Sequence, residues 1–444
     1  MKLFNSMHNK IEEFKPINEN EVKMYVCGPT VYNYAHLGNA RPIIVFDTLR
    51  KTLMKSGYQV KMVSNYTDVD DKIIKRAIEE GVNETDITSK YIKAYDEDRA
   101  SVHALMPDSA PRVTQTMDEI IQFISLLVDK KYAYEIDGDV YFRVSKIKEY
   151  GMLSNQKIDD LMVGARIDEN SKKENPLDFT LWKKTKEGIQ WDSPWSKGRP
   201  GWHTECVVMI HKEFNQDFID IHGGGLDLKF PHHENEIAQA QAAYGSSIAN
   251  YWVHNGMLNI NGEKMAKSLG NVWWLRDMVA KYSGNVVRWV MLSAHYRAPL
   301  NINEEAIKTA QTELEKIQVS LKQAYVKLGL NDYELKENRN EELWNEFLSS
   351  MQDDLNTPNA FKTLFETNKK LNVSLRQREI DCDLVGEYVN TMNEMLYVLG
   401  IDIKPIVLTD EDKLVFTKWN EAKVVKDFAT ADSYRNQLIE RGLL

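Results

Sequence analysis

Two stretches of alternating apolar and polar residues near the N-terminus flank a stretch with helical spacing. Residues 22–27 and 58–64 alternate with the period of a β-strand. Between them, from about Asn39 to Leu53, the apolar residues recur at helical spacing, and Gly57 follows at a position suited to ending a helix. This order predicts a βαβ unit, the start of a doubly wound parallel sheet with a ligand crevice beyond the carboxyl ends of its strands.

The rest of the chain divides by pattern into an insertion, a second sheet segment and a helical end. Residues 113–200 look like an insertion, with a helical pattern at 117–127 and a hairpin-like piece at 137–139. The parallel-sheet pattern returns at 218–225, and from Glu304 the pattern is almost wholly helical and highly charged. The predicted fold class is α/β: a doubly wound, Rossmann-like parallel-sheet domain with an insertion, followed by an α-helical bundle and a small C-terminal domain.

Length and composition narrow the class of protein. A chain of 444 residues is too long for one compact core, so two or more domains are expected. No apolar run approaches membrane-spanning length, and residues 1–20 are charged and interrupted by Pro16, so we expect no signal peptide, no membrane partner and a cytoplasmic protein. The formal net charge of -10 argues against non-specific coating of nucleic acid and leaves room for a local basic face.

Two short motifs are candidates for binding polyphosphate. Lys264 and Lys267 lie in a loop bracketed by glycines, where each lysine offers a compact positive charge with three donors. His36 and Asn39 lie between the first strand and its helix, near a helix N-terminus suited to phosphate. Either motif alone has an ordinary alternative, which is a solvated basic loop for the lysines and a helix cap for His36.

A candidate metal site draws on residues from three parts of the chain. His232 and Glu236 fall at i and i+4 of a helix that Pro231 is suited to start. With the two distant thiols they offer two sulfurs, one nitrogen and one oxygen to a tetrahedral Zn²⁺. His233 with Glu236 is a rival choice, and an isolated His-x-x-x-Glu is usually only a polar helix end. The thiols are those of Cys27 and Cys206.

An acidic run after the second strand has two interpretations. Residues 67–72 read Thr-Asp-Val-Asp-Asp-Lys, which suggests either a Mg²⁺ site or a helix N-cap with acids in the first turn. We favour the helix cap.

In this order, the phosphate-binding motifs resemble the two signatures of class I aminoacyl-tRNA synthetases. HIGH corresponds to His36-Leu37-Gly38-Asn39, and KMSKS to Lys264-Met265-Ala266-Lys267-Ser268. The phrases around the cysteines and histidines, at residues 24–32, 194–206 and 230–236, resemble the cysteinyl-tRNA synthetase family more specifically. The match extends into the helical region at 295–300 and 353–358. Asn39 replaces the second histidine of HIGH, and Ala266 replaces the first serine of KMSKS.

The resemblance implies that the chain activates L-cysteine with ATP and passes it to tRNA(Cys). It implies one Zn²⁺ per chain, and Mg²⁺ accompanying the ATP. By resemblance, the catalytic residues are His36, Asn39, Lys264 and Lys267. ATP is expected at Gly28, Thr30, His36, Asn39, Lys267 and Ser268. The substrate pocket is expected at Trp202, His203, His222, His233 and His254, and the zinc ligands at Cys27, Cys206, His232 and Glu236.

The resemblance also implies a division of the chain. The expected parts are the first half of the catalytic domain at 1–112, an inserted connective region at 113–200, the second half with the zinc site at 201–265, the KMSKS loop and stem-contact region at 266–310, a helical bundle at 311–400 and an anticodon-binding domain at 401–444. Because many relatives continue past this end, we expect the last domain to be reduced. We expect a monomer.

Three alternatives stay open at this point. A cysteine ligase acting on an amino-sugar acceptor would share the catalytic half. A zinc hydrolase would use an open metal position to activate water. A tRNA-binding relative without catalysis would not need both lysines.

Overall fold

The computed structural model describes residues 1–156, 172–264 and 272–444. By their internal contacts these residues form two units. The first comprises Met1–Gly284, Tyr296–Ile302 and Gln352–Leu355, and the second comprises Asn285–His295, Asn303–Met351 and Asn356–Leu444. Lys267 and Ser268, which the KMSKS signature identifies, lie outside the described residues.

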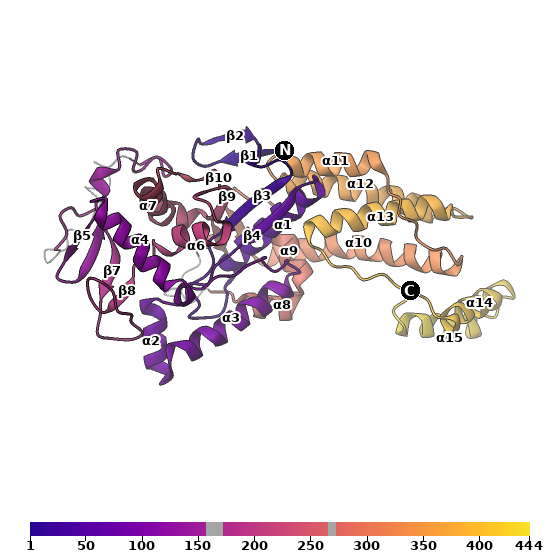
Figure 1. The fold of residues 1–444 in the computed structure, drawn as a ribbon. Helices are drawn as coiled ribbons and strands as arrows, with labels where there is room; N and C mark the ends of the chain where they lie inside the picture. The colour runs from indigo at the N-terminus through magenta and orange to yellow at the C-terminus, as the bar shows by residue number, and fades with distance from the viewer. Residues whose placement is uncertain (157–171, 265–271) are drawn as a thin grey trace. The chain divides into compact units, whose positions relative to one another are not determined.

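A four-stranded parallel sheet forms the centre of the first unit (Figure 1). Its strands lie in the order β10-β9-β3-β4, with bounds β3 Glu21–Val26, β4 Gln59–Val63, β9 Phe218–Gly225 and β10 Ile248–Asn255. The chain passes from β3 outward to β4 and later returns to the other side of β3 as β9, which creates a topological switch point between β3 and β9. The predicted α/β class with a doubly wound parallel sheet is confirmed.

Helices cover both faces of this sheet, as two adjacent glycines of β9 show. A side-chain carbon added at Gly223 would lie 2.2 Å from the ring of Phe46 in α1, Leu37–Lys55. One added at Gly224 would lie 3.1 Å from the ring of His233, just before α7, Glu234–Tyr244. Successive strand residues point to opposite faces. The helix of the first signature and the helix of the candidate metal site therefore lie on opposite faces of β9.

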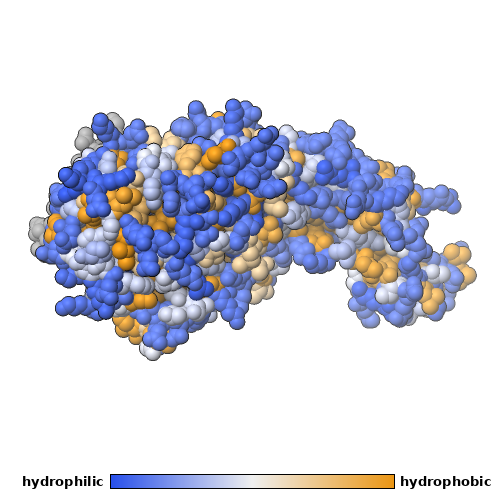
Figure 2. Space-filling model, in the orientation of Figure 1, coloured by the Kyte–Doolittle hydropathy of each residue, from blue (hydrophilic) through white to orange (hydrophobic). Residues whose placement is uncertain are grey.

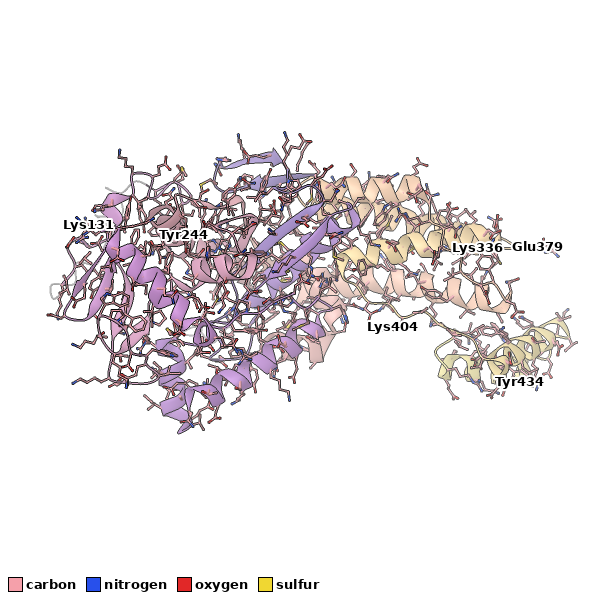
Figure 3. All side chains as sticks on the ribbon, viewed as in Figure 1. Lys131, Tyr244, Lys336, Glu379, Lys404 and Tyr434 are labelled. Atoms are coloured by element: carbon pink, nitrogen blue, oxygen red, sulfur yellow. The ribbon has the colours of Figure 1, made fainter. Side chains whose placement is uncertain are left out.

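The insertion is built around an antiparallel sheet. Its strands pair in the order β5-β6-β7-β8, with bounds β5 Ala133–Ile136, β6 Asp139–Phe142, β7 Phe179–Lys184 and β8 Gly198–Pro200. Asp137 and Gly138 join β5 to β6 with φ values of 54° and 92°, as a tight hairpin turn requires. The preceding helix α4, Met117–Asp129, packs Phe123 against Tyr244 at the end of α7, with 5.7 Å between the ring centres (Tyr244 is labelled in Figure 3). The predicted helix and hairpin are both confirmed.

The first unit contains further helices and strands, several of them short, that periodicity did not predict. A three-residue strand holds too few side chains for alternation to be recognised. The remaining elements of this unit are β1 Lys2–Asn5, β2 Lys10–Glu13, α2 Asp71–Glu80, α3 Glu84–Ser101, η1 Val113–Gln115, η2 Val144–Lys146, α6 Glu205–Phe214, η3 Leu226–Leu228, η4 Lys229–His233, β11 Leu258–Ile260, β12 Glu263–Lys264, α8 Leu275–Tyr282 and β13 Leu300–Ile302.

The acidic run at residues 67–72 contains a helix cap, as predicted. The Asp70 carboxylate accepts a hydrogen bond from the backbone N–H of Lys72 at 2.7 Å and caps α2. This supports the helix-cap interpretation of residues 67–72.

The second unit is helical. Its helices are α9 Gly284–Leu292, α10 Glu304–Leu330, α11 Glu341–Gln352, α12 Thr357–Leu375, α13 Cys382–Leu399, α14 Asp410–Val424 and α15 Phe428–Glu440, with α9 and α11 each sharing one end residue with the first unit. The apolar stripe Leu343, Phe347 and Met351 of α11 is buried. Among the described residues, no helix is long and apolar enough to span a bilayer.

The buried stripe of α11 generates the first prediction. Phe347 has no exposed surface, and its ring stacks against Trp344 with 5.8 Å between centroids. We expect Phe347→Ala to lower the free energy of unfolding by about 3–5 kcal/mol, because it leaves a cavity in the bundle. Urea unfolding of the full chain measures this, with Val373→Ala on α12, where the native side chain is 53% exposed, as the matched control. Equal losses in the two variants would contradict the assigned burial.

Candidate active site and metal-binding cluster

A cavity of about 420 Å³ opens at the carboxyl ends of the parallel strands. It is lined by the segment that follows β3, by the start of α1, and by the ends of β9 and β10. This is where the switch point of a doubly wound sheet places a ligand. Five residues expected to bind ATP, metal or phosphate line it: Cys27, Gly28, Thr30, His36 and Asn39.

The N-terminus of α1 is arranged to receive an anion. His36 precedes the helix with extended backbone, and its N–H donates to the Asn39 side-chain oxygen at 3.1 Å. The first turn carries no acidic residue, so nothing on the helix itself offsets the positive end of its dipole. The first signature therefore combines a helix N-terminus with a histidine and an amide at the cavity wall.

The chain on either side of the second signature is fixed by hydrogen bonds. Downstream, Leu37 donates its N–H to Trp273 O at 2.9 Å, and Leu275 donates its N–H to Ala35 O at 2.9 Å. Upstream, the backbone of Lys264 in β12 pairs with Asn259 of β11. Trp273 and Leu275, downstream of the signature, are therefore paired with residues on either side of His36.

Gly28 has a steric reason to be glycine. A side-chain carbon at this position would lie 1.6 Å from the carbonyl oxygen of Asn65, while the Gly28 N–H donates to the Asn65 side chain at 2.9 Å. The segment that lines the cavity is thereby held against the end of β4.

Cys27 also belongs to a cluster of metal-ligating side chains on the α7 side of the sheet. Its Sγ lies 3.7 Å from Cys206 Sγ and 3.8 Å from Glu236 Oε1. His232 Nε2 lies 3.7 Å from Cys206 Sγ and 2.8 Å from Glu236 Oε1. The regular helix begins at Glu234, after the π-turn of η4, rather than at Pro231, and His232 still faces Glu236 at i and i+4.

The Glu236 carboxylate is fully buried and shared between two histidines. Oε1 faces His232, and Oε2 lies 2.7 Å from His222 Nε2. Burial alone would raise the pKa of Glu236, but the two imidazoles outweigh it and lower the pKa well below the usual carboxyl value. Burial likewise disfavours a charged His232, yet the carboxylate raises the pKa of His232 well above its usual value.

The pKa values of the two thiols, Cys27 and Cys206, are shifted in opposite directions. Burial disfavours the Cys27 thiolate, but the hydrogen bond with Cys206 and the nearby histidines lower the pKa of Cys27 well below that of a free thiol. Burial and the proximity of Cys27 raise the pKa of Cys206. A thiolate and a carboxylate, the donors that a divalent metal ion takes, are thus already favoured in the cluster.

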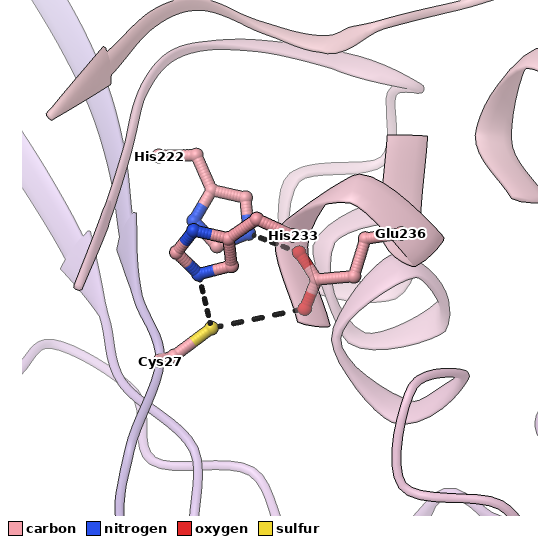
Figure 4. A group of neighbouring side chains, drawn as sticks. All are labelled: Cys27, His222, His233 and Glu236. Carbon is pink, nitrogen blue, oxygen red and sulfur yellow. Dashed lines mark hydrogen bonds and ion pairs between the residues drawn. The ribbon is translucent and has the colours of Figure 1, made fainter. Parts of the chain in front are cut away.

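Two overlapping sets of side chains bring their donor atoms within 4.8 Å of one another: Cys27, Cys206, His232 and Glu236, or Cys27, His222, His233 and Glu236. Figure 4 shows the second set, in which Cys27 Sγ lies 3.3 Å from His233 Nε2. Both histidines weighed from the sequence as partners of Glu236, His232 and His233, therefore lie within reach of a metal ion, and the second set adds His222.

The donors of the first set fit a tetrahedral zinc ion. Bond lengths of about 2.0–2.3 Å imply ligand separations of about 3.3–3.8 Å. The sulfur–sulfur, sulfur–oxygen and sulfur–nitrogen separations of 3.7, 3.8 and 3.7 Å agree, while the histidine–carboxylate pair is closer at 2.8 Å because it shares a proton. This set has two sulfur donors, which favour zinc over hard cations.

The remaining histidines surround this cluster. His203 Nδ1 lies 3.1 Å from His232 Nδ1, and His233 Nδ1 lies 2.8 Å from His254 Nε2. Burial and the neighbouring His232 lower the pKa of His203 to about 3. Of the five residues expected in the substrate pocket, Trp202 lines the cavity, and its ring stacks on His232 with 4.4 Å between centroids. Among the described residues, the four histidines His203, His222, His233 and His254 are absent from the cavity lining.

Sequence reasoning missed the buried Glu205 beside the cluster and two exposed residues of the cavity lining. Glu205 accepts a hydrogen bond from the Thr67 hydroxyl at 2.7 Å, and burial raises the pKa of Glu205 to about 8. Lys72 and Asp227 also line the cavity. The sequence held no signal for Glu205, because a glutamate at a helix start is usually exposed.

Comparison with known proteins identifies related chains. A family model described as the catalytic domain of class I (C) tRNA synthetases matches residues 13–312, and a DALR domain model matches residues 346–404. A cysteine–tRNA ligase from Halalkalibacterium halodurans is 47% identical, over 100% of this chain and 97% of the relative. One from Geobacillus sp. WCH70 is 48% identical, over the same shares.

Solved structures share the fold at low identity. A Mycobacterium tuberculosis methionyl-tRNA synthetase in complex with methionyl-adenylate superposes with a TM-score of 0.63 and 14% identity, over 86% of this chain and 89% of that one. A Thermus thermophilus arginyl-tRNA synthetase superposes with a TM-score of 0.58 and 10% identity, over 90% and 85%.

Proposed function

Because the chain belongs to the cysteine–tRNA ligase family of class I tRNA synthetases, we infer that it is an ATP-dependent cysteine–tRNA ligase. The cysteine carboxylate attacks the α-phosphorus of ATP, and pyrophosphate leaves. A ribose hydroxyl of the terminal adenosine of tRNA(Cys) then attacks the cysteinyl carbonyl, and AMP leaves. Both steps depend on positioning and on neutralising phosphate charge.

One observation carries this proposal: Cys27 is both a wall of the cavity and a member of the metal-ligating cluster. Every residue of the segment from Cys27 to His36 lines the cavity. A small amino acid whose side chain reaches Cys27 can therefore direct its carboxylate along this segment. His36 and Asn39, at the start of α1, are placed to receive the phosphates of ATP.

We propose that Cys27, Cys206, His232 and Glu236 hold one Zn²⁺. When bound, this ion supplies a soft acceptor for the substrate thiolate, which a serine hydroxyl matches poorly. His203 orients His232, and His222 holds the second oxygen of Glu236, as outer partners of metal ligands do. Lys264 and Lys267 would neutralise the leaving pyrophosphate, with Gly28, Thr30 and Ser268 as further ATP contacts and Mg²⁺ accompanying the nucleotide.

We also propose that the second unit binds tRNA, with the anticodon at α14 and α15. Figure 2 shows apolar side chains on the surface of these helices. Val424, Val425 and Phe428 are exposed in this region and adjoin the cations Lys423 and Lys426 in the sequence. Apolar and aromatic surface for stacking, next to cations for the backbone, suits unpaired RNA bases. Monomeric state and cytoplasmic location stay predictions from the sequence.

Cysteine-dependent exchange between ATP and pyrophosphate tests the proposed activity directly. We expect exchange with cysteine, almost none with serine, and charging of tRNA(Cys). An apolar pocket would separate two such similar side chains only about 10–200-fold. Exchange without transfer to tRNA would favour an amino-sugar acceptor, and ATP-independent hydrolysis would favour the zinc hydrolase. Exchange that proceeds equally with serine would contradict the role given to the cluster.

The choice between the two ligand sets gives a separate prediction. We expect about one zinc per chain by metal analysis. Cys206→Ser and His232→Ala should lose most of it, because each removes a donor of the proposed set. His233→Ala is the matched control, because His233 belongs only to the rival set and should leave the zinc content intact. The reverse result would assign the ion to His222 and His233.

The second signature gives a kinetic prediction. Lys267→Ala should lower kcat for exchange by about 100-fold or more and leave the affinity for cysteine nearly unchanged, because the charge it stabilises develops in the transition state. Lys308→Ala, at an exposed position on α10, is the control. A Lys267→Ala variant with normal exchange would remove this lysine from the mechanism.

A further inference from the structure

A buried arginine lies two residues after the first signature and has no acidic partner in the described parts of the chain. Arg41 is in the second turn of α1, and only 1% of its surface is exposed. Within the described parts of the chain, no carboxylate pairs with it, and burial alone lowers the pKa of its guanidinium to about 10. It therefore stays charged at neutral pH.

Its guanidinium binds three main-chain carbonyls from two other segments. One terminal nitrogen donates to Gly256 O at 2.8 Å and to Met257 O at 2.7 Å. The other donates to Ala298 O at 2.6 Å, and Nε has no partner among the described residues. Arg41 thus joins α1 to the turn between β10 and β11 and to the turn before β13.

The turn between β10 and β11 forms part of the cavity wall and leads along the chain to Lys264. Gly256, Met257 and Leu258 line the cavity, and β11 continues through its turn into Lys264 of β12. A side-chain carbon at Gly256 would lie 2.5 Å from Ala298 O, so the three segments already meet at close contact. A shift of Arg41 would therefore move the cavity wall, and the strand that ends at Lys264, relative to His36.

Two other cations of the same helix are paired, which makes Arg41 an exception. Lys51 contacts the Asp47 carboxylate at 2.9 Å, and Arg50 contacts the Asp108 carboxylate at 2.8 Å. An unpaired buried charge is costly, and an apolar residue would hold a purely structural position at lower cost. An anion bound in the cavity that Arg41 lines would balance its charge.

We propose that Arg41 is a positioning residue for adenylation, which clamps the β10–β11 turn to the signature helix and balances the negative charge of bound ATP across the cavity wall. The proposal rests on the proposed ligase function. Arginine suits this place because its planar fork spans carbonyls from separate segments, whereas the compact lysine ammonium does not.

The test compares Arg41→Met, Arg41→Lys and Arg50→Met in the full chain. The measurements are kcat and KM for ATP and for cysteine in pyrophosphate exchange, together with the thermal midpoint of each variant. We expect Arg41→Met to lower kcat about 100-fold with the KM for cysteine unchanged, because a small misplacement of reacting groups costs this much. Arg41→Lys should recover part of kcat, because it keeps the charge without the full clamp.

Arg50→Met removes another buried arginine from α1, away from the cavity, and should lower the thermal midpoint while keeping the wild-type kcat. Equal kcat in Arg41→Met and Arg50→Met would overturn the proposal and leave Arg41 a structural role. If Arg41→Met does not fold, Arg41→Lys decides, since a wild-type kcat in that variant would also overturn it. Absence of exchange in the wild-type protein would instead reject the ligase function.

Discussion

The buried carboxylate of Glu236 is the group on which the metal-binding cluster depends. A carboxylate without solvent contact is stable only when its charge is balanced and its oxygens are bonded. Its two oxygens bind His232, four residues earlier on the same helical face, and His222 on β9. Glu236 therefore joins the helix to the sheet and fixes both rings. Removing either histidine would leave part of that charge unbalanced, so the donor atoms are held in place by electrostatics before any metal ion binds.

The topology of the sheet explains why this cluster lies beside a nucleotide site. Cys27 directly follows β3, His222 lies on β9, Cys206 is in α6 and Glu236 is in α7. The switch point between β3 and β9, the two central strands, brings these elements together toward the carboxyl ends of the strands. The same exit from β3 leads into the N-terminus of α1, where phosphate is expected. A single connection thus supplies a sulfur donor at one end and an anion site at the other, as activation of a carboxylate by ATP requires.

Much of the fold could be predicted because its strands and helices are long enough to show their periods. The parallel-sheet pattern at 218–225 coincides with β9, and the helical spacing after Asn39 belongs to α1. Spacing could not separate His232 from His233, because both lie near Glu236, and the folded chain keeps both sets of donors together. Arg41 was beyond prediction for another reason. An arginine on a helix is usually solvated, and its burial depends on Gly256 and Ala298, which are distant in sequence.

Two histidines beside the cluster, His203 and His254, are neutral and add no charge to it. Burial and His232 lower the pKa of His203 to about 3, and burial together with His233 lowers the pKa of His254 well below its usual value. Both rings are therefore uncharged at neutral pH. Each can orient a neighbouring imidazole through one ring nitrogen without adding positive charge beside a site meant for a cation. Of the five histidines in and around the cluster in the described chain, His222 and His232 have a raised pKa, and these are the two that contact Glu236. Positive charge among these rings is thus confined to the two that contact the carboxylate, and the other rings supply geometry alone.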